Sequence, residues 1–505
     1  MISKHIVTAL TLAPCVIMVS GCAKQVAPIP VHTPAREPAH ASIAAPVAAR
    51  RSGRTGNIVD ALTTAYFLDT VRVYLPPPEW LLQGAVIQPE YNHAEIGDVT
   101  GDGRRDVISV LTNMPDGYQV IIYAQTPNGT FSAPQIHVLP APIHESPLWL
   151  RIADMNRDGV QDVIAIRWQS VNLLLSQPDG SKSWRAHPVG DLGMDVAPVV
   201  ADMDRDGNQD VVAHVSSWGS TANQNTDNRA RIVIYFGDGV GGFPRQQTTY
   251  TYGVDPSDVE RANGLAIGDL DGDGDSDVGL SVRQFDYWGQ RWSYRTDVFP
   301  YDRATGFASP ANISHDPRAQ YLAIGDFNGD RRDDLAISND EITPLETKIY
   351  IHHQRADGSL STSPVVKSTY LDATDLDATD LDGDGDTDLL VGHSSQSRVG
   401  YYLQSGGALQ DAAYRQSITF RGPSMGPTSQ ASGDMDGDGC PDVAVAARFD
   451  GLWLIRGAGC APRRRITGGR SQPLLWQTST VLQASQSAAI VAPAAQRAPL
   501  RRQHR

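Results

Sequence analysis

The chain has 505 residues and a formal net charge of −15 at pH 7. The charge is uneven: residues 1–57 carry +5 and residues 461–505 carry +8, and subtracting both from −15 leaves −28 for residues 58–460. A body this acidic repels the phosphates of nucleic acids and attracts divalent cations, so we expect no nucleic-acid partner. Frequent glycine and aspartate with few aromatic residues are typical of short strands joined by tight turns.

Residues 1–21 are predicted to be an export signal. A basic start, Lys4-His5, precedes an apolar run from Ile6 to Val19 that is too short to be a stable membrane-spanning helix. The run ends in Val19-Ser20-Gly21-Cys22, which resembles the bacterial lipobox, whose cysteine is lipidated and becomes the first mature residue. The alternative is an ordinary signal peptide with a chance cysteine. Under the resemblance, Ala23 implies sorting to the outer membrane, where the acyl chains would anchor the protein without spanning. The face of that membrane is left open.

Residues 22–57 are rich in alanine, proline and basic residues, which predicts a flexible tether between the lipid and the folded body. Apolar density rises from Ile58. The alternating residues from Thr70 to Leu75 predict a strand, and Ala85 to Gln88 predict a second one.

An acidic loop then recurs seven times, at intervals of roughly 50 to 65 residues, which indicates a repeat architecture. In the copy from Asp380 to Asp388, side-chain oxygens occupy positions 1, 3, 5 and 9 and glycine occupies position 6. Oxygen ligands at this density suit Ca²⁺, and the glycine allows a sharp turn around the ion. Just upstream, Asp375 and Asp377 fit positions 1 and 3 of a shifted register. Thr379 and Gly383 would then occupy positions 5 and 9, so we prefer the register that starts at Asp380.

The candidate ligands, at positions 1, 3, 5 and 9 of the seven loops in chain order, are Asp98, Thr100, Asp102 and Asp106; Asp154, Asn156, Asp158 and Asp162; Asp202, Asp204, Asp206 and Asp210; Asp269, Asp271, Asp273 and Asp277; Asp326, Asn328, Asp330 and Asp334; Asp380, Asp382, Asp384 and Asp388; and Asp434, Asp436, Asp438 and Asp442.

Each loop is flanked by runs that predict the first two strands of a sheet, such as Leu148 to Ala153 before the second loop and Asp162 to Ile166 after it. A third strand follows, such as Gln119 to Tyr123, and a glycine turn leads to a fourth. Four antiparallel strands per repeat describe a propeller blade, so residues 58–460 are predicted to form an all-β, seven-bladed β-propeller. The last repeat lacks a strand, and we expect the strand at Val71 to Leu75 to complete it and close the ring.

These loops, the Val/Leu strand after them and the Gly-x-Phe turn, as in Gly241-Gly242-Phe243, resemble FG-GAP or VCBS repeats. Such repeats build the seven-bladed propeller of integrin α chains and of many bacterial surface proteins. The resemblance implies up to seven structural Ca²⁺ ions, bound by the candidate ligands named above. Two loops depart from the pattern: the first has Thr100 at position 3, and the fifth has Asn328 at position 3 and Arg331 in place of glycine. We rank loops four and six strongest, three and seven next, two intermediate, and one and five weakest.

Rival interpretations of the loops are weaker. EF-hands need a glutamate at position 12 between flanking helices, whereas Ser109, Leu280 and Val391 hold that position inside predicted strands. Dockerin-like modules pair such loops much more closely on helices. Acidic turns without a metal are a further alternative.

No catalytic residue is predicted. Gly422-Pro423-Ser424-Met425-Gly426 matches G-x-S-x-G but is followed by Pro427 rather than by a helix. His352, His353 and His393 lie in or beside predicted strands without metal-binding spacing.

After removal of the signal, Cys440 and Cys460 can pair in an oxidising compartment, and we predict a disulfide between them; two unpaired thiols are the alternative. The basic residues 461–505 are predicted to be a mostly disordered tail, in which Leu474 to Trp476 and Thr480 to Leu482 could form one more strand.

The aromatic stretch from Phe285 to Tyr294 suits stacking on sugars or docking of a protein, and the insertion from Ser216 to Arg229 occupies the same point of the preceding blade. An enlarged hairpin that packs between blades is the simpler interpretation. We therefore predict a monomeric, non-enzymatic, calcium-stabilised propeller, lipid-anchored at the outer membrane and used for binding or adhesion to an unidentified protein or glycan. The alternative is a lectin or a carbohydrate-active enzyme on the same scaffold.

Overall fold

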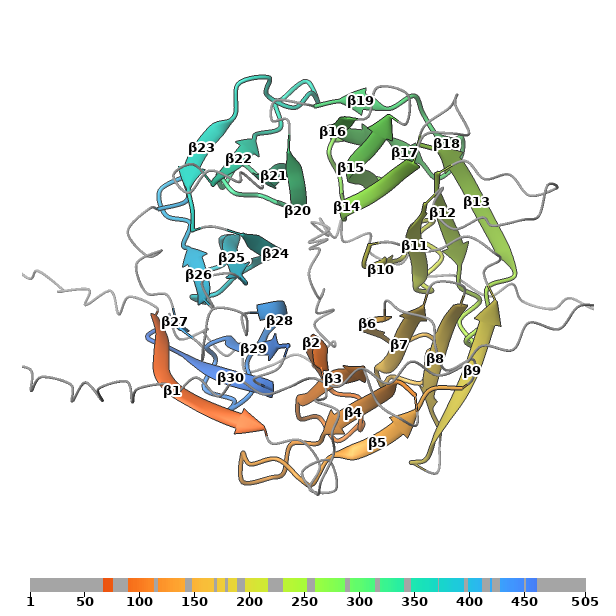
Figure 1. Cartoon of the computed structure of the whole chain (residues 1–505), viewed down its shortest axis with the longest axis vertical. Helices are drawn as coiled ribbons and strands as arrows, with labels where there is room; N and C mark the ends of the chain where they lie inside the picture. The colour runs from red at the N-terminus through yellow and green to blue at the C-terminus, as the bar shows by residue number, and fades with distance from the viewer. Residues whose placement is uncertain are drawn as a thin grey trace, which may run out of the picture. The chain divides into compact units, whose positions relative to one another are not determined.

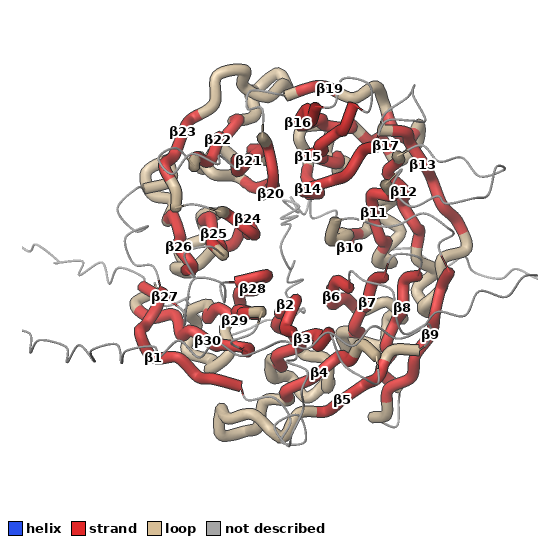
Figure 2. The backbone as a smooth tube through the Cα atoms, in the orientation of Figure 1, coloured by secondary structure: helices blue, strands red, loops and turns tan. Residues whose placement is uncertain are grey.

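The computed structural model describes residues 67–75 and 90–460, with gaps at 113–116, 141–147, 168–169, 178–179, 189–195, 217–229, 252–258, 287–290, 314–317, 340–346, 371, 395–397, 411–417, 420–426 and 449–450. Every regular element in these ranges is a β-strand, as Figure 2 shows. Within the same ranges, no helix is long and apolar enough to cross a bilayer. The strands belong to the compact unit Leu62–Arg505.

The sheets of this unit surround one axis as seven four-stranded antiparallel blades (Figure 1). From the innermost strand outward, blade one contains β2 (Glu90–Gly97), β3 (Asp106–Thr112), β4 (Gln119–Tyr123) and β5 (Gln135–Val138). Blade two contains β6 (Leu148–Ala153), β7 (Asp162–Arg167), β8 (Ser170–Ser176) and β9 (Lys182–Pro188). Blade three contains β10 (Val199–Ala201), β11 (Asp210–Val215), β12 (Arg231–Phe236) and β13 (Arg245–Tyr250).

Blade four contains β14 (Val259–Gly268), β15 (Asp277–Asp286), β16 (Arg291–Phe299) and β19 (Ala311–Asn312), and the two-stranded sheet of β17 (Tyr301–Asp302) and β18 (Gly306–Phe307) lies between β16 and β19 in the chain. Blade five contains β20 (Ala319–Gly325), β21 (Asp334–Asn339), β22 (Lys348–His352) and β23 (Val365–Ser368). Blade six contains β24 (Ala373–Thr379), β25 (Asp388–His393), β26 (Arg398–Tyr402) and β27 (Ile418–Thr419).

Blade seven combines strands from both ends of the propeller. β28 (Pro427–Gly433), β29 (Asp442–Ala447) and β30 (Gly451–Ala458) follow blade six, and β1 (Phe67–Leu75) supplies the outer strand. β1 and β30 are antiparallel, with Phe67 opposite Ala458 and Leu75 opposite Leu452. The prediction that an N-terminal strand closes the ring is confirmed, and this strand begins at Phe67 rather than at Thr70.

The core consists of seven buried apolar clusters, one between each pair of neighbouring blades. One cluster joins Ile96 and Tyr123 of blade one to Ala444 and Leu454 of blade seven, so side-chain packing also closes the circle. Second strands such as β3 and β7 are buried on both faces, which explains their continuous β-branched runs. The outer strands β9 and β13 are polar and largely exposed.

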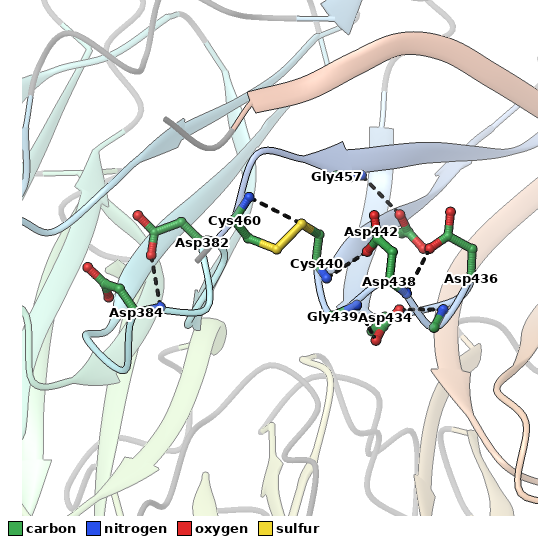
Figure 3. The surroundings of a disulfide bond; sticks show 11 residues. Asp382, Asp384, Asp434, Asp436, Asp438, Gly439, Cys440, Asp442, Gly457 and Cys460 are labelled. Carbon is green, nitrogen blue, oxygen red and sulfur yellow. Dashed lines mark hydrogen bonds between the residues drawn. A yellow bond between two sulfur atoms is a disulfide. The ribbon is translucent and has the colours of Figure 1, made fainter. Parts of the chain in front are cut away.

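The disulfide between Cys440 and Cys460 is confirmed, with the two Cα atoms 5.4 Å apart (Figure 3). It links Cys440 of the seventh acidic loop to Cys460, two residues after the end of β30. The bond therefore fastens the blade that closes the ring. The predicted strand at Ala85 to Gln88, the predicted signal and tether up to residue 57, and the predicted tail at 461–505 lie outside the described residues.

Candidate metal centres

The seven acidic loops connect the innermost strand of each blade to its second strand, which excludes the helix-flanked EF-hand arrangement in the described residues. In every loop the fourth and sixth residues have positive φ. The sixth residue is glycine in six loops and Arg331, with φ of 66°, in the fifth. At the fourth position, Arg157 and Arg205 adopt the same left-handed conformation, which is sterically costly for a residue with a Cβ. Glycine at position 6 indicates this requirement in the sequence, whereas arginine at position 4 of the second and third loops does not.

The first aspartate of each loop accepts hydrogen bonds from the loop backbone. In the first loop Asp98 accepts from the N–H groups of Gly101 and Gly103 at 2.6 and 2.7 Å. The bond from the sixth residue to the first recurs in the other six loops. The loop backbone therefore wraps around the position 1 carboxylate.

The ninth aspartate fastens the loop to the end of the third strand or to the residues just after it, a role that the sequence pattern does not show. In the sixth loop, Asp388 accepts from the N–H of Leu381 through Oδ2 and from the N–H of Gln404 through Oδ1, both at 2.7 Å. The same two bonds occur at Asp106, Asp162, Asp210, Asp277, Asp334 and Asp442. Because each carboxylate oxygen has a second lone pair, this arrangement is compatible with cation binding.

Burial raises the pKa of the ninth aspartates, to about 8 at Asp277 and Asp388 and to about 7 at Asp162, Asp210 and Asp442. In the sixth loop, burial and the neighbouring Asp384 charge raise the pKa of Asp382 to about 6. The charged forms of these groups are therefore disfavoured, and a nearby cation would favour them again.

Four loops bring three carboxylate oxygens within 4.8 Å of one another. These are loop three (Asp202, Asp204, Asp206), loop four (Asp269, Asp271, Asp273), loop six (Asp380, Asp382, Asp388) and loop seven (Asp434, Asp436, Asp442). Neither cysteine nor histidine is part of these clusters. Dense oxygen donors of this kind fit a hard cation such as Ca²⁺ better than Zn²⁺.

Arginine side chains neutralise the position 5 aspartate in the first and fifth loops. Arg104 pairs with Asp102, and Arg332 pairs with Asp330. Each arginine also donates through Nε to a backbone carbonyl beyond the third strand, at 3.0 and 3.1 Å. In the fifth loop, His353 Nδ1 lies 2.8 Å from Asp334 Oδ2, and the contact raises the pKa of His353. These two loops therefore already contain positive charge.

The third and seventh loops each have an arginine beside their position 3 aspartate, whereas the second loop has an asparagine at position 3. Arg245 contacts Asp204 of the third loop, and Arg456 Nη1 lies 2.9 Å from Asp436 of the seventh. In the second loop Asn156 Nδ2 donates to Asp158 at 3.1 Å. All of these contacts are between side chains of the protein itself, so the assignment of positions 1, 3, 5 and 9 as calcium ligands stays a prediction.

A further acidic cluster, which sequence analysis did not find, adjoins the fourth loop. Asp273, Asp275 and Asp302 lie within 4.8 Å of one another. Asp302 is the last residue of β17, so its proximity to the loop depends on the fold of blade four. Arg205 and Arg303 each lie 3.5 Å from Asp275 and balance part of the charge.

Of the other singled-out residues, His352 and His393 are buried strand residues of β22 and β25, as predicted. Phe285 and Trp292 extend the β15–β16 hairpin, with ring centroids 5.0 Å apart. Cys22, Gly422 to Gly426 and residues 217–229 lie outside the described residues.

The fold and the loops together define a seven-bladed β-propeller with an acidic loop in every blade. More particularly, the chain carries FG-GAP-like repeats: the model of the FG-GAP-like repeat matches residues 98–165, 154–213, 326–391 and 380–445. Each matched segment begins at the first aspartate of a loop and ends within the second strand of the next blade.

No curated protein matches the chain. Among solved structures, the chain is similar to a chain of the Photorhabdus luminescens Tc holotoxin pore, with 15% identity and a TM-score of 0.31. The match covers 71% of this chain and 17% of that chain.

Proposed function

We propose that this protein is a calcium-stabilised, lipid-anchored propeller of the bacterial outer membrane that acts as a binding or adhesion module rather than as an enzyme. The observation that carries the calcium part is the clustering of three carboxylate oxygens in four of the seven loops. Sites at loop positions 1, 3, 5 and 9 use oxygens alone, and each loop fills its own cage, which favours a structural role for the ion.

Calcium titration tests this proposal. At about 1 mM calcium and a Kd of about 0.1 mM, each occupied site would stabilise the fold by about 1.4 kcal/mol. We expect excess EDTA to lower the melting temperature of the full chain sharply and calcium, but not potassium, to restore it. Substitution of Asp384→Asn should reduce the calcium response, whereas Asp357→Asn, in an exposed turn, should leave it unchanged. An identical melting curve in EDTA and in calcium would disprove the calcium role.

The anchor is supported by the lipobox-like sequence that ends at Cys22. We expect the full chain to incorporate labelled palmitate in its bacterial host and to fractionate with the outer membrane. The Cys22→Ala variant should incorporate none, and label that persists in this variant would contradict the assignment.

A lectin-like function is the second candidate, and the observation that favours it is on the enlarged hairpin of blade four. Trp292 is 43% exposed and lies beside Phe285, while Arg283 lies 5.3 Å from the Trp292 ring. Aromatic faces next to a guanidinium suit stacking on sugar rings. A glycan and surface-protein binding screen with and without calcium, repeated with Trp292→Ala, distinguishes a glycan from a protein ligand.

A further inference from the structure

Three of the seven innermost strands carry a charged residue at the same position relative to their acidic loop. The residue three places before each acidic loop pairs with the residue two places after the ninth aspartate: Glu95 with Ile108, Arg151 with Ile164 and Asp377 with Leu390. The equivalent residues of the other blades are Val199, Ala266, Ala323 and Ala431. Because these strands are the innermost of their blades (Figure 1), the three charged residues lie at the same level of neighbouring parts of the ring. Asp377 of blade six interacts electrostatically with Glu95 of blade one and Arg151 of blade two.

These charges and their neighbours form one electrostatic group, which we call the axial group: Glu95, Arg151, Asp375, Asp377 and Gln430. Arg151 Nη1 lies 3.1 Å from Glu95 Oε1, and Asp375 Oδ2 accepts from the N–H of Gln430 at 3.2 Å. Burial raises the pKa of Glu95 to about 7 and of Asp375 to about 6, and raises that of Asp377 well above its ordinary value. A single guanidinium thus faces three carboxyl groups.

The axial group also contains buried polar atoms without a hydrogen-bond partner in the described part of the chain. They are Glu95 Oε2, Arg151 Nε, and both amide atoms of Gln430. Glu95 and Gln430 are each only 1% exposed. Buried polar atoms in folded proteins are nearly always hydrogen-bonded to protein, to ordered water or to a ligand, so these atoms can bind a water molecule or the polar group of a ligand.

The carboxylates of the axial group do not converge as metal ligands do. Among the described residues, the groups of three acidic side chains with oxygens within 4.8 Å of one another all lie in or beside the acidic loops. A directly coordinated metal ion therefore fits poorly, whereas an ammonium group carries three donors that separate acceptors can share. We propose that the axial group is a binding site for the primary ammonium group of a small aliphatic amine, such as a diamine.

Calorimetric titration of the full chain with putrescine, in calcium and in EDTA, tests this site, with 1,4-butanediol as the neutral ligand of similar length. We expect putrescine to bind and butanediol not to bind. Asp377→Asn and Glu95→Gln should each weaken putrescine binding at least tenfold, while Asp357→Asn, the same charge change at an exposed turn, should not. Circular dichroism and a melting curve of each variant establish that it is folded.

The site is refuted if putrescine produces no heat, or if it binds folded Asp377→Asn and folded Glu95→Gln as tightly as the original chain. Equal binding of butanediol would also overturn it, because the ammonium charge would then be irrelevant. Magnesium that displaces putrescine at equal concentration would identify a metal site instead. None of these outcomes depends on whether the loops bind calcium, since the calcium response is measured separately by the EDTA melt.

Discussion

Substitution of Asp388 by alanine separates the fastening role of the ninth aspartate from any role in calcium binding. Both carboxylate oxygens of Asp388 accept buried backbone N–H groups, from Leu381 and from Gln404, at 2.7 Å. Alanine leaves both donors without a partner. A buried unsatisfied group costs about 1–3 kcal/mol, so the two together should lower the free energy of unfolding by about 2–6 kcal/mol.

The informative comparison is with Asp384→Ala in the same loop. Asp384 is exposed, and its Oδ1 accepts from the N–H of Asp386 at 2.9 Å within the turn. In EDTA this change should cost only about 0.5 kcal/mol, as is usual for surface substitutions. In calcium, Asp384→Ala should lower the free energy of unfolding by about a further 1.4 kcal/mol if the sixth loop binds the ion with a Kd of about 0.1 mM.

Urea unfolding in excess EDTA, followed by tryptophan fluorescence, measures both variants. We expect a large decrease in the unfolding midpoint for Asp388→Ala and a small one for Asp384→Ala. If Asp388→Ala unfolds in EDTA within about 0.5 kcal/mol of the original chain, the buried carboxylate does not fasten the loop, and the hydrogen-bond reasoning is wrong.

Three further predictions follow from other contacts. Cys440→Ser with Cys460→Ser should lower the free energy of unfolding by about 3 kcal/mol, since the bridged residues are 20 apart, and dithiothreitol should then have no added effect on thermal melting. Arg332→Gln removes the cation from Asp330, so the difference in melting temperature between calcium and EDTA should widen; an unchanged difference would contradict the idea that arginine supplies the charge of the fifth loop. Burial alone would raise the pKa of Glu260, but its contacts with His214 and Arg295 lower it from 4.5 to about 2. Its stabilising contribution is thus complete above pH 4.5 and lost as the pH falls towards 2, so the stability difference between the original chain and Glu260→Gln should shrink over that range in acid-unfolding curves.

Much of the fold could be predicted because the repeat marks its own boundaries. The third strand at Gln119 to Tyr123 has the predicted bounds, since a short apolar run with a glycine turn after it marks the strand. The count of strands in the last repeat predicted that β1 closes the ring, because an unpaired edge is unfavourable.

The local chemistry of the loops was less predictable. Glycine at position 6 revealed one left-handed residue, but Arg157 and Arg205 concealed the other, because arginine gives no signal for positive φ. The second hydrogen bond of each ninth aspartate joins the start of the second strand to a residue at or just beyond the end of the third strand, as between Asp388 and Gln404, so spacing within the loop does not show it.

The axial group was beyond sequence reasoning for a different reason. Asp375 and Asp377 were considered as members of a shifted metal loop, and β24 instead places them in a strand, in agreement with the register that begins at Asp380. Their proximity to Glu95 and Arg151 requires blade six to lie two places from blade one around a closed circle. Neighbourhoods of this kind depend on ring closure and not on distance along the chain.

The pairing of β1 with β30 also has a mechanical consequence. Phe67 and Ala458 lie at opposite ends of the propeller sequence, yet they are direct neighbours in blade seven. The chain can complete this circle only after its last blade has been made, so the strand nearest the N-terminus is expected to be the last to find its partner. Tension applied to the N-terminus would load this same seam first. The backbone hydrogen bonds between β1 and β30 would then decide how much force the ring withstands before it opens, because the disulfide between Cys440 and Cys460 does not cross this seam.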